Sequence, residues 1–305
     1  MSASLPRRAA SAVATAAALA LLGAAPATAH QAHGAGHHGH GTEHHRHGHG
    51  HGHPKQIDYV NLGDSYSAAI GTGGVVESPP GSGCYQGDGP DHVSALDAKK
   101  RVDLLLDAAC AGATTSGIRQ VVSSPAVTAA LAEAELVTLT LGGNDVGWIE
   151  IIRACSLQGS APVCDGLIAD APQRIEAAAA SAGETVAAVD ARTRGQVVVL
   201  GYPELFSEDP KSPLISAQRA EQLNDLTEEL NDALEEAVEQ DDAAEFVDVA
   251  PRFEGHAVDS GDPWIYYDPA APGDPNNLHP TERGYLFGYY KALKDEIGLG
   301  HLARH

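Results

Sequence analysis

The chain has 305 residues, of which 43% are hydrophobic, and its 41 acidic residues outnumber the 19 basic ones, giving a net charge of −22. Such an acidic surface repels nucleic acid and anionic membranes, so neither is expected as a partner. The sequence after residue 54 is long enough for one sizeable core, and we expect a single domain over residues 55–305.

Residues 1–29 have the pattern of a secretory signal peptide. Arg7 and Arg8 form a short basic region, an Ala/Leu/Val run follows to about Leu22, and Ala27-Thr28-Ala29 supplies a cleavage site. We therefore expect a secreted, extracellular protein whose mature chain begins near His30. A stable membrane anchor is not expected, because the apolar run is short and no stop-transfer pattern follows it.

Residues 30–54 form a leader made mainly of glycine and histidine, which ends in HGHGHGH before Pro54. This composition cannot build a core and predicts a disordered segment. Neutral imidazoles at this density bind zinc, nickel or copper to some degree. We interpret that metal binding as incidental. The alternative is a secreted metal-binding protein that acts through its leader.

Five short apolar segments predict strands at 57–62, 102–106, 136–141, 196–200 and 246–249. Helical patterns occupy residues 173–193, a leucine-rich stretch from 223 to 238, and a last segment from about 280 to 297. Apolar strands that alternate with amphipathic helices are typical of a parallel sheet covered on both faces. The predicted fold class is α/β, a three-layer α/β/α sandwich.

The four cysteines are typical of an exported chain in which all are paired. Four cysteines allow three pairings, and the sequence does not choose among them. Pairing of neighbours, Cys84 with Cys110 and Cys155 with Cys164, closes the shortest loops and is favoured. A Cys₄ metal site is disfavoured because no C-x₂-C pair occurs, so no metal site is assigned.

Polar and glycine residues follow the first three predicted strands, where sites form in parallel sheets. Gly63-Asp64-Ser65 ends the first strand. A serine at a strand-to-helix turn can expose its hydroxyl as a nucleophile, although a helix N-cap is an equal alternative on this motif alone. Gly112 follows the second strand, and Gly142-Gly143-Asn144-Asp145 follows the third.

Asn144 and Gly112 can donate hydrogen bonds to a developing oxyanion, Asn144 through its amide and Gly112 through its main-chain N–H. The alternative is that both belong to ordinary turns, which glycine and asparagine favour. Trp148, four residues after Asn144, is expected in the core, with a place at the border of the pocket as the alternative.

His279 lies in Asn276-Asn277-Leu278-His279-Pro280, directly before the last predicted helix. A base at this position can reach across the strand ends and accept the proton of Ser65. His256, in a loop after the fifth strand, is the alternative base. His92 is expected in an exposed segment, and His301 and His305 lie in the tail, so these three are weaker candidates.

These segments resemble, in order, the four sequence blocks of the SGNH/GDSL hydrolase family, and the cysteine pattern is similar to that of secreted actinobacterial lipases and esterases. The resemblance implies a flavodoxin-like sandwich and hydrolysis of carboxylic esters through an acyl-enzyme. It implies that Ser65 is the nucleophile and His279 the base. The main-chain N–H groups of Ser65 and Gly112, with the side chain of Asn144, would form the oxyanion hole.

The resemblance implies no metal or organic cofactor, and a small-molecule or lipid ester as the substrate. A carbohydrate deacetylase is the alternative enzyme. Aromatic residues make up only 5% of the chain, which weakly favours soluble or short-chain esters over a large acyl group.

The last block departs from the usual D-x-x-H pattern, because Asn276 stands where the family has an aspartate that orients the histidine. Some secreted relatives use a Ser–His dyad, in which a main-chain carbonyl just before the histidine takes that role. We therefore predict that the carbonyl of Asn276 or Asn277 orients His279. Asp274, the nearest upstream acid, is the alternative.

Overall fold

A computed structural model describes residues 56–207, 214–240 and 244–298. The predicted signal peptide, the predicted leader up to Pro54, His301 and His305 lie outside the described residues. None of the helices in the described ranges combines the length and the apolar character that crossing a bilayer requires.

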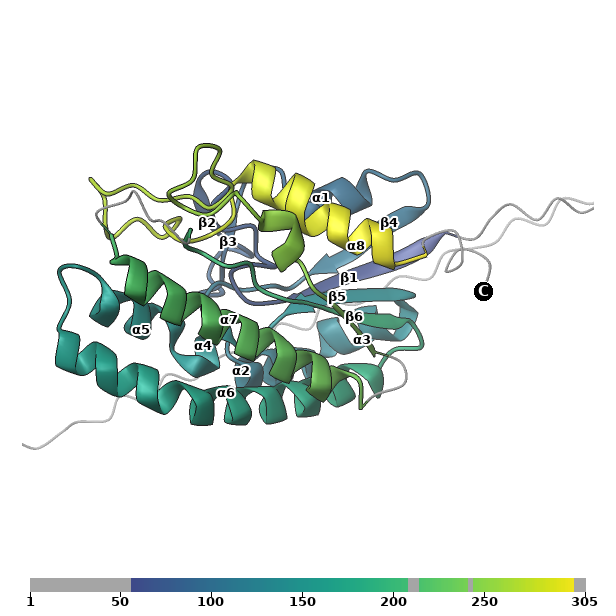
Figure 1. The fold of residues 1–305 in the computed structure, drawn as a ribbon. Coiled ribbons are helices and arrows are strands. Elements are labelled where there is room, and N and C mark those ends of the chain that lie inside the picture. The colour runs from purple at the N-terminus through teal and green to yellow at the C-terminus, as the bar shows by residue number, and fades with distance from the viewer. Residues whose placement is uncertain (1–55, 208–213, 241–243, 299–305) are drawn as a thin grey trace, which may run out of the picture. The chain divides into compact units, whose positions relative to one another are not determined.

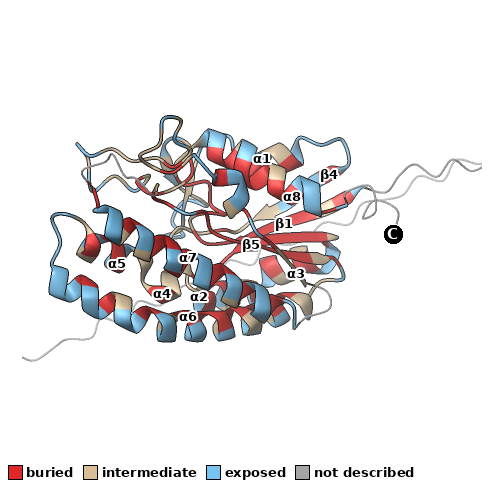
Figure 2. Cartoon of the chain, in the orientation of Figure 1, coloured by how far each residue is buried: buried red, intermediate tan, exposed pale blue. Residues whose placement is uncertain are grey.

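The core of the fold is a five-stranded parallel sheet in the order β4-β1-β5-β6-β7 (Figure 1). All five predicted strands are present, each within two residues of its expected bounds. The three inner strands β1, β5 and β6 are almost wholly buried, as Figure 2 shows for β5, because helices cover both faces of the sheet. The strands are β1 (Ile57–Gly63), β4 (Val102–Asp107), β5 (Leu136–Thr140), β6 (Gln196–Leu200) and β7 (Ala244–Val247).

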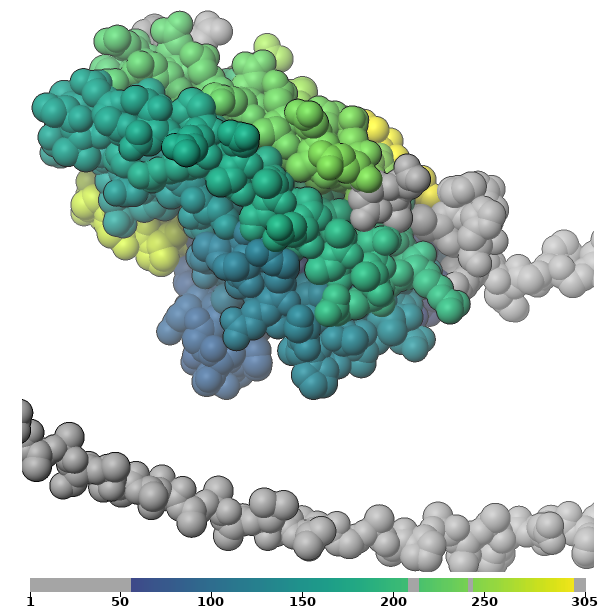
Figure 3. Space-filling model, turned by 90° about the horizontal axis from the view of Figure 1, so that it is seen from below, coloured from purple at the N-terminus to yellow at the C-terminus, as the bar shows by residue number. Residues whose placement is uncertain are grey.

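Two helical layers enclose the sheet, which confirms the predicted three-layer sandwich. One layer holds α1 (His92–Asp97), the π-helical turn η2 (Gly284–Tyr289) and α8 (Tyr290–Glu296). The other layer includes α6 and α7, which run side by side along one face (Figure 3). Its helices are α2 (Thr115–Val122), α3 (Pro125–Glu133), α4 (Gly143–Val146), α5 (Trp148–Cys155), α6 (Ala161–Asp190) and α7 (Ala217–Val238).

The strand order places β1 between β4 and β5, which is the flavodoxin-like arrangement. The chain runs from β1 to β4 on one side of β1 and then crosses to β5 on its other side, so a crevice forms beyond the carboxyl ends of β1 and β5. Ser65 follows β1 and Asn144 follows β5, so the topology alone brings these two predicted site residues to the same crevice. A small antiparallel hairpin of β2 (Val75–Glu77) and β3 (Tyr85–Gly87) and the 3₁₀ helix η1 (Ala250–Phe253) complete the described elements.

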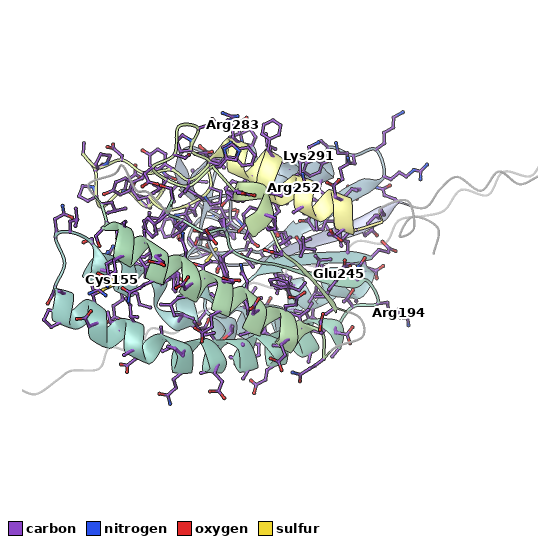
Figure 4. All side chains as sticks on the ribbon, viewed as in Figure 1. Cys155, Arg194, Glu245, Arg252, Arg283 and Lys291 are labelled. Atoms are coloured by element: carbon purple, nitrogen blue, oxygen red, sulfur yellow. A yellow bond between two sulfur atoms is a disulfide. The ribbon has the colours of Figure 1, made fainter. Side chains whose placement is uncertain are left out.

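The structure joins Cys84 to Cys110 and Cys155 to Cys164. The first disulfide ties Cys84, in the connection between β2 and β3, to the loop after β4. The second ties α5 to the start of α6, at the opposite end of the domain from Arg194 and Glu245 (Figure 4). Each closes a loop on the carboxyl side of the sheet and contributes on the order of 2–4 kcal/mol to the free energy of unfolding.

Candidate active site

The turn after β1 exposes Ser65 by burying the residue before it. Gly63 has φ +117°, and a Cβ at this position would lie 2.6 Å from the carbonyl oxygen of Thr140, so only glycine fits. The buried carboxylate of Asp64 accepts hydrogen bonds from the Thr140 hydroxyl at 2.6 Å and from the Tyr66 N–H at 3.0 Å. With Asp64 turned inward, Ser65 remains partly exposed at the strand end.

Asp64 also connects the serine turn to the start of α4. The Tyr202 hydroxyl donates to Asp64 at 2.6 Å and accepts from the Gly143 N–H at 3.1 Å. Desolvation raises the pKa of Asp64, while the hydrogen bonds from Thr140, Tyr202 and Tyr66 lower it. No role was predicted for Asp64 or Tyr202 from the sequence. The available signal was the position of Tyr202, which directly follows Gly201 at the end of β6.

His279 contacts both Ser65 and the main chain of its own loop. Its Nε2 lies 2.8 Å from the Ser65 Oγ, and its Nδ1 lies 3.0 Å from the carbonyl oxygen of Asn277. Desolvation lowers the pKa of His279 to about 4, against the opposing effect of hydrogen bonds with the Asn277 and Asn276 backbone. The ring is therefore neutral at pH 7. With the proton on Nδ1, facing a carbonyl, Nε2 is free to accept a proton from Ser65.

Leu278 has the left-handed φ of +65°, which is uncommon for a residue with a large side chain. Its carbonyl accepts a hydrogen bond of 2.6 Å from the Tyr66 hydroxyl, and its N–H donates to the Tyr266 carbonyl at 2.7 Å. These bonds hold the strained residue, and the turn it makes brings the Asn277 carbonyl beside the ring of His279. Strain of this kind concentrates at functional sites.

Asn276 and Asp274 fasten the histidine loop through contacts that do not involve His279 side-chain atoms. The Asn276 amide accepts from the Gly71 N–H at 2.9 Å and donates to the Gly73 carbonyl at 3.2 Å and to Asp274 at 3.0 Å. Asp274 also accepts from the Tyr266 hydroxyl at 3.1 Å. Among the described residues, therefore, the acceptor at His279 Nδ1 is a main-chain carbonyl and not the Asp274 carboxylate.

The three predicted oxyanion donors, the N–H groups of Ser65 and Gly112 and the Asn144 amide, follow the ends of β1, β4 and β5. The Asn144 amide nitrogen uses one hydrogen to bond the Ala113 carbonyl at 2.9 Å and has a second one to offer. Gly112 has φ +79°, and in the described part of the chain neither its N–H nor that of Ser65 has a hydrogen-bond acceptor. The Cys110 N–H donates to the Gly63 carbonyl at 2.9 Å, and the Ala113 carbonyl accepts the bond from Asn144. Gly112 therefore lies between a residue bonded to the turn that carries Ser65 and a residue bonded to Asn144.

The other candidate histidines lie elsewhere. His92 was expected to be exposed, and this is wrong: it is wholly buried against η2, with its ring stacked on Tyr285 at 5.6 Å. The segment holds α1, which packs against β4 and against η2 and α8 of its own layer, and the short helix gave no clear periodicity. His256 stacks on Trp264 at 3.7 Å and its Nδ1 lies 2.8 Å from the Asp262 carbonyl.

Ser65, Asn144 and His279 open onto a small cavity of about 50 Å³. Trp148 packs against the core and also lines this cavity, so both interpretations of the residue hold in part. The wall is otherwise largely apolar and includes Ile149, Ile152, Leu205 and Leu230. No group of three or more His, Cys, Asp or Glu side chains suited to a metal ion occurs within the described ranges.

Comparisons with known proteins agree with this geometry. The model of the GDSL-like lipase/acylhydrolase family matches residues 62–286. The chain is 31% identical over 239 residues to a lipase of Streptomyces rimosus, covering 77% of this chain and 85% of that protein. It is 28% identical over 238 residues to lipase 1 of Streptomyces coelicolor, again with 77% and 85% of the two chains covered.

Two crystal structures share the fold closely. The extracellular lipase from Streptomyces rimosus superposes with a TM-score of 0.68 at 29% identity, over 79% of this chain and all of that one (100%). Phospholipase A1 from Streptomyces albidoflavus gives a TM-score of 0.68 at 26% identity, with 78% and 98% of the two chains covered.

Proposed function

This chain belongs to the GDSL-like lipase/acylhydrolase family and is a carboxylic ester hydrolase, and from this premise we propose that it works through a Ser–His dyad of Ser65 and His279. One observation carries the proposal. His279 lies 2.8 Å from the Ser65 hydroxyl on one side and 3.0 Å from the Asn277 carbonyl on the other. A neutral imidazole held between a hydroxyl and a carbonyl is the arrangement that general-base activation of serine requires.

In the proposed reaction, Ser65 Oγ attacks the ester carbonyl carbon while His279 Nε2 accepts its proton. The N–H groups of Ser65 and Gly112 and the Asn144 amide donate to the oxyanion of the tetrahedral intermediate. His279 then returns the proton to the alcohol as the ester bond breaks. Water, activated by His279, hydrolyses the acyl-enzyme and regenerates Ser65. These steps need no metal or organic cofactor.

The proposed domain organisation is a signal peptide over residues 1–29, a leader over 30–54 and the hydrolase domain over 55–305, in a secreted protein. The two disulfides support this, because such bonds persist in oxidising compartments outside the cytosol. The relative from Streptomyces rimosus is itself described as extracellular.

The proposed substrate is a small or lipid ester with a short acyl group. By the same measure of volume, one water molecule needs roughly 10–15 Å³, so a cavity of about 50 Å³ holds an acyl chain of only a few carbons. The apolar wall of Ile149, Leu205 and Leu230 suits such a chain.

The proposal is tested with the mature chain, residues 30–305, on p-nitrophenyl esters of increasing acyl length, with and without EDTA. We expect turnover that survives EDTA and falls for longer acyl groups. A fluorophosphonate should inactivate the enzyme at one adduct per chain, and peptide mass spectrometry should place the adduct on Ser65. An adduct on another residue, or folded protein that cleaves no ester, would contradict the proposal.

The pH dependence of kcat/KM should show an acid limb near pH 4, well below the ordinary histidine pKa of about 6.5. Protonated His279 cannot act as a base, and desolvation lowers its pKa, so the active neutral form persists to lower pH. The measurement is p-nitrophenyl acetate hydrolysis from pH 3 to 8 at constant ionic strength, with circular dichroism to show that the fold persists. A limb between about pH 6 and 7 would mean a solvated or carboxylate-paired histidine.

Asp274→Ala should lower kcat by less than about tenfold, because its carboxylate bonds Asn276 and Tyr266 and makes no hydrogen bond with His279. Steady-state kinetics on the same ester measures this. A loss near 10³, approaching the effect of altering a true triad aspartate, would replace the dyad by a triad.

Asn276→Asp restores the acid that the family usually has at this position, yet we expect no gain in kcat. The new carboxylate would lose the hydrogen bond to the Gly73 carbonyl and would face Asp274, so the free energy of unfolding should fall by about 1–2 kcal/mol. Urea unfolding and kinetics on one preparation measure both effects, with Asn276→Ala as the uncharged control. A rise in kcat would mean that the loop rearranges to let the acid reach His279.

A further inference from the structure

A second depression lies on the outer side of His279. This groove has a volume of about 760 Å³, within the range of typical ligand pockets. It shares Ile149, Ile152, Leu278 and His279 with the small cavity but does not include Ser65 or Asn144. The rest of its lining combines apolar and polar residues. The apolar ones are Leu214, Tyr267, Pro269, Pro272 and Pro275, and the polar or charged ones are Arg153, Ser156, Gln158, Asp274 and Asn277.

The small cavity and the groove border different residues of the proposed catalytic site. The small cavity contacts the nucleophile Ser65 and the oxyanion donor Asn144, so it borders the carbonyl carbon and its acyl substituent. Of Ser65, Asn144 and His279, the groove borders only His279. In the proposed reaction His279 Nε2 must protonate the leaving oxygen, so the substituent on that oxygen lies on the histidine side.

From this arrangement we propose that the groove is the subsite for the alcohol portion of the substrate, and that this portion is a bulky, largely apolar alcohol. The inference rests on the proposed function and extends it. The acyl group occupies the small cavity of about 50 Å³, while the groove of about 760 Å³ takes the larger part of the ester. Selectivity then depends more on the alcohol than on the acyl chain.

The groove wall is held in shape before substrate binds. Three prolines at 269, 272 and 275 restrict the backbone of the loop that forms it. The buried side chain of Asn277 accepts from the Asp268 N–H at 2.7 Å and donates to the Ala271 carbonyl at 2.8 Å. A preformed wall loses little conformational entropy on binding, as a subsite requires.

Gly273 offers a direct way to fill the groove. It is exposed, lines the groove, and has open space around the position of a Cβ, so Gly273→Trp adds bulk without a backbone clash. Gly261 is a matched control, because it is also exposed, has equally open surroundings, and lines a different depression beside Asp259 and Ser260.

The experiment compares kcat/KM of the wild type, Gly273→Trp and Gly261→Trp on two ester series, after thermal unfolding has shown that all three fold. One series varies the alcohol at constant acetyl group: ethyl, 2-naphthyl and dodecyl acetate. The other varies the acyl group at constant p-nitrophenol. We expect Gly273→Trp to lower kcat/KM for the two bulky acetates by about tenfold or more, with ethyl acetate and the acyl-length profile near wild type. Gly261→Trp should change neither.

Two results would overturn the inference. If Gly273→Trp altered the acyl-length profile and not the alcohol profile, the groove would hold the acyl chain. If it altered neither profile, the groove would not contact substrate. Both results leave ester hydrolysis itself intact, whereas a wild type inactive on every ester would contradict the proposed function instead.

Discussion

Replacing Ser65 with alanine should lower kcat for ester hydrolysis by about 10⁶, because it removes the hydroxyl that contacts His279 and forms the acyl-enzyme in the proposed mechanism. Substrate binding should change little, since the cavity wall keeps its apolar residues. His279→Ala should lower kcat to a similar extent, because the two residues act as a unit through their 2.8 Å contact. The double variant should be no worse than either single one, as for residues that work in a single step. Steady-state rates of folded preparations at saturating p-nitrophenyl acetate, with the protein concentration taken from absorbance, would test this.

The controls for these variants come from residues of the same type outside the site. Ser123→Ala alters an exposed serine after α2, and His256→Ala alters the histidine that the sequence left as the alternative base. Both should retain kcat within about twofold, since neither is among the residues around the cavity. If His256→Ala lost activity and His279→Ala kept it, the base would be wrongly assigned.

Asn144→Ala should lower kcat by about 10²–10³ and leave KM nearly unchanged. The Asn144 amide has one hydrogen beyond its bond to the Ala113 carbonyl, and we expect that hydrogen to reach the oxyanion only in the tetrahedral intermediate. A donor that acts mainly in the transition state affects kcat, because the ground-state carbonyl does not depend on it.

The Asn144→Asp variant distinguishes the loss of the hydrogen-bond donor from the loss of side-chain volume. It keeps the size but replaces the donor by a carboxylate that repels the oxyanion, so its kcat should be at least as low as that of the alanine variant. Steady-state kinetics and thermal unfolding of both variants provide the test. A rise in KM with kcat preserved would mean that Asn144 only binds substrate.

The sheet could be predicted because its strands are continuous apolar runs that end in glycine or polar residues. The helices were harder. The helical pattern was predicted over residues 173–193, whereas in the structure α6 begins at Ala161 and continues through Pro172, a residue that usually ends or kinks a helix. The short helices α1 and α5 have six and eight residues, too few to show a period of 3.6 in the sequence.

The residues at strand ends could be read from the sequence, whereas the residues that position them could not. Asp64 was visible as part of Gly63-Asp64-Ser65, but its bonds to Tyr202 and Thr140 join residues far apart in the chain. The expectation for the histidine loop was limited in the same way. The sequence left the carbonyls of Asn276 and Asn277 and the carboxylate of Asp274 open, and in the structure the acceptor at His279 is the Asn277 carbonyl.

Under the proposed mechanism, the acceptor that orients His279 belongs to the peptide backbone, so no codon specifies it. A genetic screen for inactive variants would recover Ser65, His279 and the oxyanion donor Asn144, but no position whose side chain orients the histidine, even though a main-chain group does so. Position 277 could change identity during evolution without removing that group, provided that the loop keeps the left-handed turn at Leu278. Selection would therefore act on the backbone conformation of this loop. A search for acidic side chains near His279 would overlook this part of the catalytic machinery.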